Sequence, residues 1–358
     1  MPVVGASNPL RMIACVARVL ALCALVGSPI AAFETDQYLA WEQELEDSTD
    51  RVNGFVNDET VNVLERINRS GRPDLTCEEI PFRIYHRFFG SLLRSRIRHF
   101  LATDPEIDRF PDRKVGYFGY IKRSVFRKPA FPFFLPMART LRIDGINLGA
   151  DKLGHLFGFG RRYYARYRRL RRRGLSEQEA MRRVVLWGYR MERIAVGGLV
   201  DGVVSHADLE ANFQGLRLAR NLCEAEPPHL VRGDQGWRLE RPIDLRDYVN
   251  PRFDETYNQN RFTRLRWMRV KPILEKEYCR KYRTAAVQGL MSRYRARDRP
   301  SFASAVIAEH TAKRGYDLRR RAQSLEVLCA TDRAVASVAA APVVGRGRSE
   351  TTPTPRSP

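Results

Sequence analysis

Apolar residues recur at three- and four-residue spacing through most of the chain, a pattern typical of amphipathic helices. This spacing predicts helices at 36–41, at 60–67, at two places within 81–100, and at 301–313. A short strand is expected at 237–239, and the proline-rich segment 129–136 is expected to form an apolar loop. The chain is therefore predicted to be mainly α, a helical bundle with little β structure.

The clearest helical unit covers residues 146–223. Its first helix begins at Asp151 and ends at Gly174, a residue that commonly terminates helices. A capping-box pattern that starts at Ser176 opens the second helix, and Ser205 opens a third helix that runs to about residue 223. Because the link between Gly174 and Ser176 is short, the first two helices should lie antiparallel.

This antiparallel arrangement brings polar side chains to one end of the unit. Glu192 lies opposite residue 158, about one helical turn from His155. Asp151 is one turn further along, and the third helix starts where the second ends. Five polar side chains are therefore expected to converge: Asp151, His155, Glu192, Asp208 and Asn212.

A helical wheel of the third helix places Asp208 and Asn212 in the middle of its apolar arc. The residues expected on the opposite side are Glu210, Gln214, Arg217 and Asn221. A carboxylate on a buried face has to be paired, protonated or bound to a ligand. One interpretation is structural, with helix caps and a hydrogen-bonded pair of His155 and Glu192 that tie the helices together.

The other interpretation is a metal site. Asp151, His155, Glu192 and Asp208 offer one imidazole and three carboxylates, which suit Zn²⁺, Mn²⁺ or Fe²⁺. A carboxylate left free could then act as general base on a metal-bound water, so all five converging residues are catalytic candidates. No nucleophile elbow, phosphate loop or HExxH motif indicates a particular class of hydrolase.

The first 32 residues have the pattern of a signal peptide: two arginines, no acidic residue, an apolar run, and small residues before Phe33. Cleavage after Ala32 is expected, with an uncleaved membrane anchor as the alternative. No later stretch reaches the about 18 apolar residues that a membrane span needs. Four cysteines remain after cleavage, and their even number in an exported chain predicts two disulfides whose pairing stays open: Cys77, Cys223, Cys279 and Cys329.

These features divide the chain into five parts. The expected parts are a signal peptide (1–32), an N-terminal helical region (33–145), the three-helix module (146–223), a loop-rich and helical region (224–332) and a disordered tail (333–358). The tail is rich in Ala, Pro, Ser, Thr and Arg and lacks a periodic apolar pattern.

Charge adds a second candidate feature, because the chain carries a net charge of +21. The segment 161–173 holds three tyrosines, no acidic residue and eight arginines: Arg161, Arg162, Arg166, Arg168, Arg169, Arg171, Arg172 and Arg173. Such a segment could bind anionic lipid, lipopolysaccharide or peptidoglycan, with arginines on the anionic groups and tyrosine rings at the interface. The alternative is a solvated helix face, and export argues against nucleic acid as a partner.

The three-helix module resembles the DKxxH module of small bacterial envelope proteins, such as the YfiM-type lipoproteins and, more distantly, the VanZ-like proteins. The matching residues run from Asp151-Lys152 and His155 through Gly188 and Glu192 to the segment 205–215, about 65 of the 358 residues. The YfiM-type family has no established activity, and the VanZ-like proteins are associated with glycopeptide resistance. The resemblance therefore implies a role in the cell envelope rather than a mechanism.

Three residues of the loop-rich segment 237–258 are accessory candidates, namely Asp247, Tyr248 and Glu255, with surface hydrogen bonding as the alternative. The function expected from the sequence is that of a periplasmic or envelope-associated, noncatalytic helical scaffold with a buried polar network and affinity for anionic lipid or glycan. The alternative is a metal-dependent hydrolase that acts on an envelope lipid or a peptidoglycan component.

Overall fold

The computed structural model describes residues 34–71, 75–90, 95–130, 137–198, 201–313 and 325–330. The predicted signal peptide, most of the predicted loop 129–136 and the predicted tail 333–358 lie outside these residues. Within them the chain is mainly helical, as predicted. The α-helices are α2 (Thr49–Arg69), α3 (Ile80–Phe88), α4 (Arg96–Thr103), α5 (Tyr117–Ile121), α6 (Ala150–Arg172), α7 (Glu177–Met191), α8 (His206–Glu224), α9 (Arg264–Ile273), α10 (Cys279–Tyr282), α11 (Ala285–Arg297), α12 (Phe302–Ala312) and α13 (Leu325–Leu328).

Several shorter helical turns connect these helices. The predicted helix at 36–41 is a 3₁₀ helix, η1, and the end of α7 widens into a π-helical turn, η4. The turns are η1 (Gln37–Glu42), η2 (Cys77–Glu79), η4 (Glu192–Val196), η5 (Leu245–Asp247), η6 (Pro251–Phe253) and η7 (Leu274–Tyr278). The caps follow the sequence signals, because the side chains of Ser176 and Ser205 each accept a hydrogen bond from the backbone N–H three residues later.

The β structure consists of two-stranded pairs. The strands are β1 (Glu34–Thr35), β2 (Met137–Ala138), β3 (Thr140–Ile143), β4 (Ile146–Gly149), β5 (Val203–Val204), β6 (Leu230–Gly233), β7 (Gly236–Leu239) and β8 (Arg261–Phe262). β1 pairs with β2, β3 with β4, β5 with β8 and β6 with β7. The predicted strand at 237–239 is confirmed as β7. The β3–β4 hairpin was not predicted, although Asp144-Gly145 at its turn has positive φ at both residues and is a typical hairpin signal.

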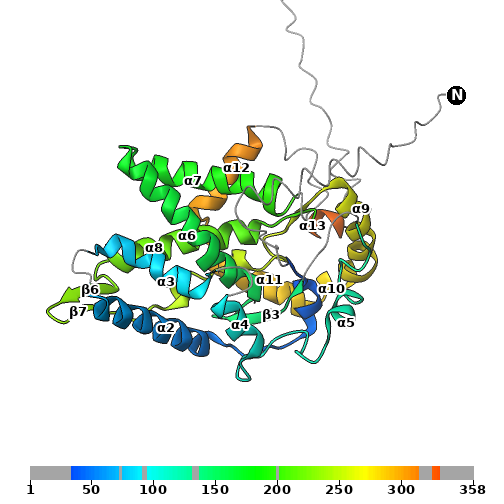
Figure 1. The fold of residues 1–358 in the computed structure, drawn as a ribbon. Helices are drawn as coiled ribbons and strands as arrows, with labels where there is room; N and C mark the ends of the chain where they lie inside the picture. Colours follow the sequence, from blue (N-terminus) through cyan, green and yellow to red (C-terminus); the bar gives the residue numbers. More distant parts are fainter. Residues whose placement is uncertain are drawn as a thin grey trace, which may run out of the picture.

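Helices α6 and α8 of the predicted module run into the middle of the molecule and α7 lies at its upper edge, with α2 along the lower edge and α9 and α10 at the right (Figure 1). α6 packs along α8 more extensively than any other pair of elements. Close approach is possible because Gly160 of α6 faces Gly215 of α8, and a Cβ on Gly160 would lie 2.8 Å from the Gly215 Cα. This crossing fixes the position of the first turns of both helices.

Two disulfides staple the fold, as the cysteine count predicts. Cys77 pairs with Cys223 and joins η2 to the end of α8, and Cys279 pairs with Cys329 and joins α10 to the residue after α13. Disulfides are typical of proteins that fold in an oxidising compartment.

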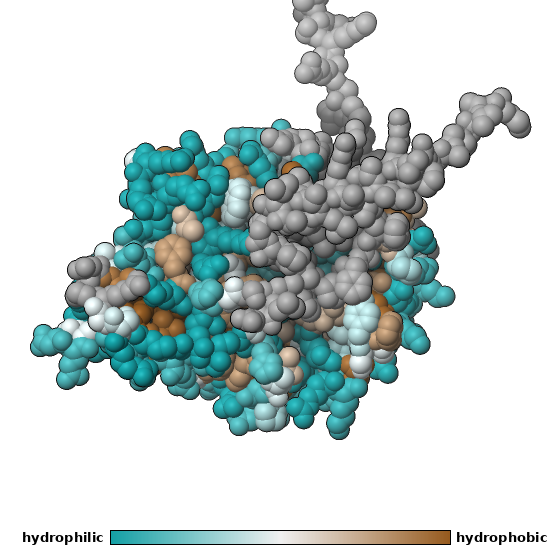
Figure 2. Space-filling view, in the orientation of Figure 1, coloured by the Kyte–Doolittle hydropathy of each residue, from teal (hydrophilic) through white to brown (hydrophobic). Residues whose placement is uncertain are grey.

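None of the described helices is both long enough and apolar enough to cross a membrane. Hydrophilic residues cover most of the described surface in Figure 2, with hydrophobic residues in small separate groups.

Candidate functional site

The first turns of α6 and α8 meet beside the β1 strand and the loop that carries Glu255. Their polar side chains form one buried group, which we call the Lys152 cluster: Asp151, Lys152, His155, Asp208, Asn212 and Glu255. Four of the five residues expected to converge belong to this cluster, and the fifth, Glu192, is buried beside it, where it binds the backbone of Ser205. The cluster is closed to solvent, because the Lys152 side chain is 0% exposed and His155 is 6% exposed.

Lys152 is the centre of this group, although the sequence analysis identifies it only as part of the DKxxH pattern. Its Nζ donates to Asp151 Oδ2 at 2.6 Å, to Asp208 Oδ1 at 2.6 Å, and to Glu255 Oε1. Three carboxylates thus use all three donors of one ammonium group. Burial alone would lower the pKa of Lys152, but Asp151, Asp208 and Glu255 raise it well above its ordinary value.

Neutral groups donate further hydrogen bonds to the carboxylates of Asp151 and Glu255. Thr35 Oγ1 donates to Asp151 Oδ1 at 2.6 Å, Ser205 Oγ donates to Glu255 Oε1 at 3.1 Å, and Asn260 Nδ2 donates to Glu255 Oε2 at 2.9 Å. Burial, opposed by Lys152, raises the pKa of Glu255 to about 7. This carboxyl therefore takes up a proton near neutral pH.

His155 lies at the edge of the cluster, with its ring stacked on Phe159. Its Nδ1 is 3.1 Å from the Asn212 Oδ1 acceptor, and its Nε2 is 3.2 Å from Asp208 Oδ2. Asp208 Oδ2 is buried and accepts no hydrogen bond of good geometry from the described residues. If Nδ1 carries the imidazole hydrogen, His155 Nε2 and Asp208 Oδ2 are two acceptor atoms that face each other. This arrangement requires a proton or a metal ion between these two atoms.

Glu192 is buried as predicted, but it pairs with the backbone rather than with His155. Its Oε1 accepts from the Ser205 N–H at 3.3 Å. Burial raises the pKa of Glu192 well above the ordinary value, and the negative charges of Asp208 and Asp201 raise it further. Burial likewise raises the pKa of Asp201 and Glu34, two acids that the sequence analysis missed. This part of the core therefore disfavours the charged form of these three carboxyl groups.

The fit to a metal ion is partial. Single ligand atoms of Asp151, His155 and Asp208 lie within 4.8 Å of one another, the only such set among the described residues. Lys152, however, binds an oxygen of both aspartates, and Thr35 holds the second oxygen of Asp151. His155 Nε2 and Asp208 Oδ2 are the two donor atoms of this set that remain available, whereas zinc sites generally use three or four protein ligands.

The arginine-rich end of α6 differs from the expected interface in one respect. Its tyrosines, Tyr163, Tyr164 and Tyr167, are buried in the core and cannot lie at a membrane surface. Their burial follows from the helical period, because these positions face α3, α7 and α8. The arginines point in several directions: Arg162 covers the Phe159 ring and Arg166 covers Trp187.

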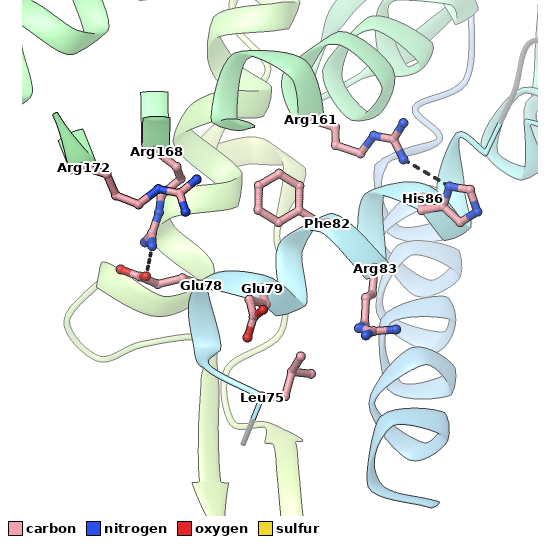
Figure 3. A pocket seen from close by; sticks show the side chains of 9 residues that line it. All are labelled: Leu75, Glu78, Glu79, Phe82, Arg83, His86, Arg161, Arg168 and Arg172. Atoms are coloured by element: carbon pink, nitrogen blue, oxygen red, sulfur yellow. Dashed lines mark hydrogen bonds and ion pairs between the residues drawn. The ribbon is translucent and has the colours of Figure 1, made fainter. Parts of the chain in front are cut away.

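Three arginines of α6 do gather beside α3, where they line a hollow with a volume of about 580 Å³ (Figure 3). A second hollow of about 600 Å³ shares Arg83 and His86 with the first. We call the two together the basic groove, and its basic residues are Arg66, Arg83, His86, Arg87, Arg96, Arg161, Arg168 and Arg172. Arg168 pairs with Glu78, and Arg87 and Arg96 pair with Glu59. Arg83 and Arg172 form no ion pair with any described residue.

The three accessory candidates from the segment 237–258 lie in different environments. Glu255 is part of the cluster, Tyr248 is buried and accepts a hydrogen bond from Asn221, and Asp247 is exposed in η5.

The prediction of the solvent-facing side of α8 was partly wrong, since Glu210 and Gln214 are buried. Glu210 accepts hydrogen bonds from Gln214, Asn250 and Ser301, which come together only in the folded chain.

Comparison of the chain with protein-family models, with curated proteins and with solved structures finds no match.

Proposed function

We propose that this chain is an exported cell-envelope protein in which the Lys152 cluster is structural and the basic groove binds anionic lipid or glycan. The central ammonium of the cluster is fully used inside the protein: Lys152 directs its three donors to three carboxylates, and neither Lys152 nor His155 is open to solvent. A group of this kind specifies how α6 and α8 pack together. Because the cluster is closed to solvent, we assign ligand binding to the basic groove on the surface of the protein.

The basic groove is the observation that carries the binding role. Arg83 projects from α3, and Arg161, Arg168 and Arg172 project from α6 around one hollow (Figure 3). The carboxylates in this hollow are Glu78, which holds Arg168, and Glu79, which caps η2 through Thr76. The remaining positive charge matches the phosphate and carboxylate groups of envelope lipids and glycans. Phe82 and Leu75 add apolar surface beside these charges.

The envelope location rests on three further observations. The sequence before Phe33 has the pattern of a signal peptide, and the chain carries two disulfides. The DKxxH pattern resembles that of YfiM-type and VanZ-like envelope proteins. We place the protein in the periplasm or against the envelope on these grounds.

Binding to anionic vesicles is expected to depend on Arg83 and Arg172. The chain should sediment with vesicles of phosphatidylglycerol and phosphatidylcholine at low salt, and not with phosphatidylcholine alone. Each arginine near an anionic surface contributes about 1 kcal/mol, so Arg83→Gln with Arg172→Gln should weaken binding roughly thirty-fold. Co-sedimentation over a range of lipid concentrations measures this change.

A matched control is Arg173→Gln with Arg171→Gln, which removes the same number of positive charges next to Arg172 at the end of α6 but changes no residue that lines the basic groove. This control should weaken binding no more than a few-fold. Vesicle binding that ignores lipid charge and salt, or equal losses in both double variants, would contradict the role of the groove.

The second candidate function is a metal-dependent hydrolase of an envelope lipid or a peptidoglycan component. It is favoured by one observation: His155 Nε2 and Asp208 Oδ2 lie 3.2 Å apart, and Asp208 Oδ2 has no hydrogen-bond donor among the described residues. Two ligands of one metal ion lie at about this separation when each bond is about 2 Å. In that arrangement Asn212 would orient the imidazole through Nδ1.

Metal content separates the two candidates. Elemental analysis of the chain, purified without chelator, is expected to find less than about a tenth of an equivalent of Zn, Mn or Fe if the cluster is structural. A full equivalent that is lost in His155→Ala, and kept in the control His310→Ala, would overturn the scaffold proposal. His310 is a suitable control because it is half-buried against Tyr189, away from the cluster.

A further inference from the structure

The basic groove holds two separate centres of positive charge. The first centre consists of Arg168 and Arg172, which line the hollow of about 580 Å³ from α6. The second centre lies in the hollow of about 600 Å³ beside α2 and α3, and it consists of Arg66, Arg83, Arg87 and Arg96. Figure 3 shows Arg168 and Arg172 on one side of Phe82 and Arg83 on the other side.

The first centre keeps an excess of positive charge. Glu78 pairs with Arg168, whereas the Arg172 side chain makes no ion pair or hydrogen bond with any described residue. Burial lowers the pKa of Arg168 and the positive charge of Arg172 lowers it further, so the two guanidinium groups lie near each other. One carboxylate therefore faces two guanidinium groups, and Arg172 is exposed and available to a ligand.

The second centre has a similar excess. Glu59 binds both Arg87 and Arg96, so one carboxylate again faces two guanidinium groups. Arg83 is exposed and makes no ion pair or hydrogen bond with any described residue. Arg66 bonds through Nε to a carbonyl of its own helix at 2.9 Å, and its two Nη groups make no hydrogen bond with the described residues. The described residues that line this hollow include no acid.

Contacts between α6 and the segment from η2 to α3 give the separation of the two centres. Arg168 pairs with Glu78, and Arg161 Nη1 is 3.1 Å from His86 Nδ1. Arg161 and Arg168 are seven residues apart on α6, which corresponds to about 10 Å at the helical rise per residue. Arg83 lies one turn before His86 on α3, so the two centres are on the order of 10 Å apart.

The surface between the two centres is partly apolar and carries one carboxylate. Phe82 lies between them, and Leu75 lines the same hollow. Glu79 also lines this hollow, and its Oε2 accepts a hydrogen bond from the Thr76 N–H at 3.0 Å. An anionic group placed between the centres would be repelled by Glu79, so the middle of the ligand should be neutral. The flat ring of Phe82 offers a surface on which a sugar ring can pack.

Given the proposed binding of lipid or glycan by the groove, on which this inference rests, we propose that the ligand is a glycolipid whose disaccharide headgroup carries a phosphate at each end. One phosphate binds in the first centre, chiefly to Arg172, and the other binds in the second centre, to Arg66 and Arg83. The neutral disaccharide spans the distance between them and packs on Phe82. Two phosphates on one ligand bind more tightly than one, because the second contact forms within the same complex.

Two forms of one glycolipid test this proposal. Phosphatidylcholine vesicles contain either the bisphosphorylated disaccharide lipid or its monophosphorylated form, with phosphatidylglycerol added to the second set until the total charge is equal. We expect the purified chain to bind the bisphosphorylated form about ten-fold or more tightly in co-sedimentation, as expected for a further charge-assisted contact. Arg172→Gln should remove most of this preference. The matched control Arg171→Gln, which changes a residue that lines neither hollow, should keep it.

Three results would overturn the proposal: equal binding of the two lipids by the wild type, a preference that survives in Arg172→Gln, or an equal loss of preference in Arg171→Gln. Each leaves the proposed function standing, provided that binding still depends on salt and falls in Arg83→Gln with Arg172→Gln. The absence of charge-dependent binding to every vesicle would instead overturn the proposed function and this proposal together. Because Arg172 is exposed and has no ion pair, its replacement should not affect folding, which thermal unfolding checks.

Discussion

Replacement of Lys152 by methionine is expected to lower the free energy of unfolding by about 4 kcal/mol at pH 7. Methionine has nearly the same length, so the main loss is the ammonium group that holds Asp151, Asp208 and Glu255. Removal of one member of a buried charged group leaves its partners without compensation, and this costs more than the group itself contributes. Urea denaturation followed by circular dichroism measures the effect.

The pH dependence of the stability of Lys152→Met shows whether uncompensated carboxylates cause the loss. Lys152 lowers the pKa of Glu255 against the effect of burial, so without Lys152 the folded-state pKa of this carboxyl should lie further above its unfolded-state value of about 4. A raised folded-state pKa gives stability at low pH that is lost as the pH rises through that pKa. Because Glu255 has a pKa of about 7 with Lys152 present, wild type and variant should lose stability in parallel from pH 4 to about pH 7, and the difference between them should grow as the pH rises further.

An exposed lysine is the control for this experiment. The Lys313 side chain is 71% exposed and pairs with Glu309 on the surface, so Lys313→Met should change stability by less than about 0.5 kcal/mol. A Lys152→Met variant as stable as this control would contradict a structural role for the cluster. A loss of stability that does not depend on pH would attribute the effect to packing instead of to uncompensated carboxylates.

The convergence of Asp151, His155, Asp208 and Asn212 could be predicted because it depends on local rules. Helix periodicity, the caps at Ser176 and Ser205, and one short link determine which helix ends meet. Lys152 could not be predicted in the same way, because lysine is rarely buried without carboxylate partners. One of these partners, Glu255, is 103 positions away in the sequence.

The errors in the polar sides of the helices have a similar origin. A helical wheel describes one helix against one core, whereas α8 is covered on its second side by Ser301 and Asn250, which bind Glu210. The tyrosines of α6 were assigned to an interface because arginines surround them in the sequence. In the fold the arginines extend outward from the same turns while the rings pack inward, as long amphipathic side chains commonly do. A run of arginines in the sequence therefore shows that a segment is positively charged, but it does not show which side chains of that segment face solvent.

The α6–α8 crossing gives the second large effect, since Gly215→Ala is expected to destabilise the fold by about 3 kcal/mol or more. A Cβ at this position would collide with the carbonyl oxygen of Leu156 and lie 2.8 Å from the Gly160 Cα. Both obstacles are backbone atoms of α6, so no side chain can rotate to make room. The helices would have to separate, which would also move Asp208 away from His155 and Lys152.

Gly54→Ala is the matched control for this prediction. Gly54 lies inside α2, and no atom is within 4 Å of the Cβ that alanine would add. Alanine favours the helix there, so this variant should gain about 0.5 to 1 kcal/mol, and thermal unfolding should show opposite shifts for the two substitutions. Equal midpoints would mean that α6 and α8 tolerate a wider separation, and the close helix contact would then not be what positions the Lys152 cluster.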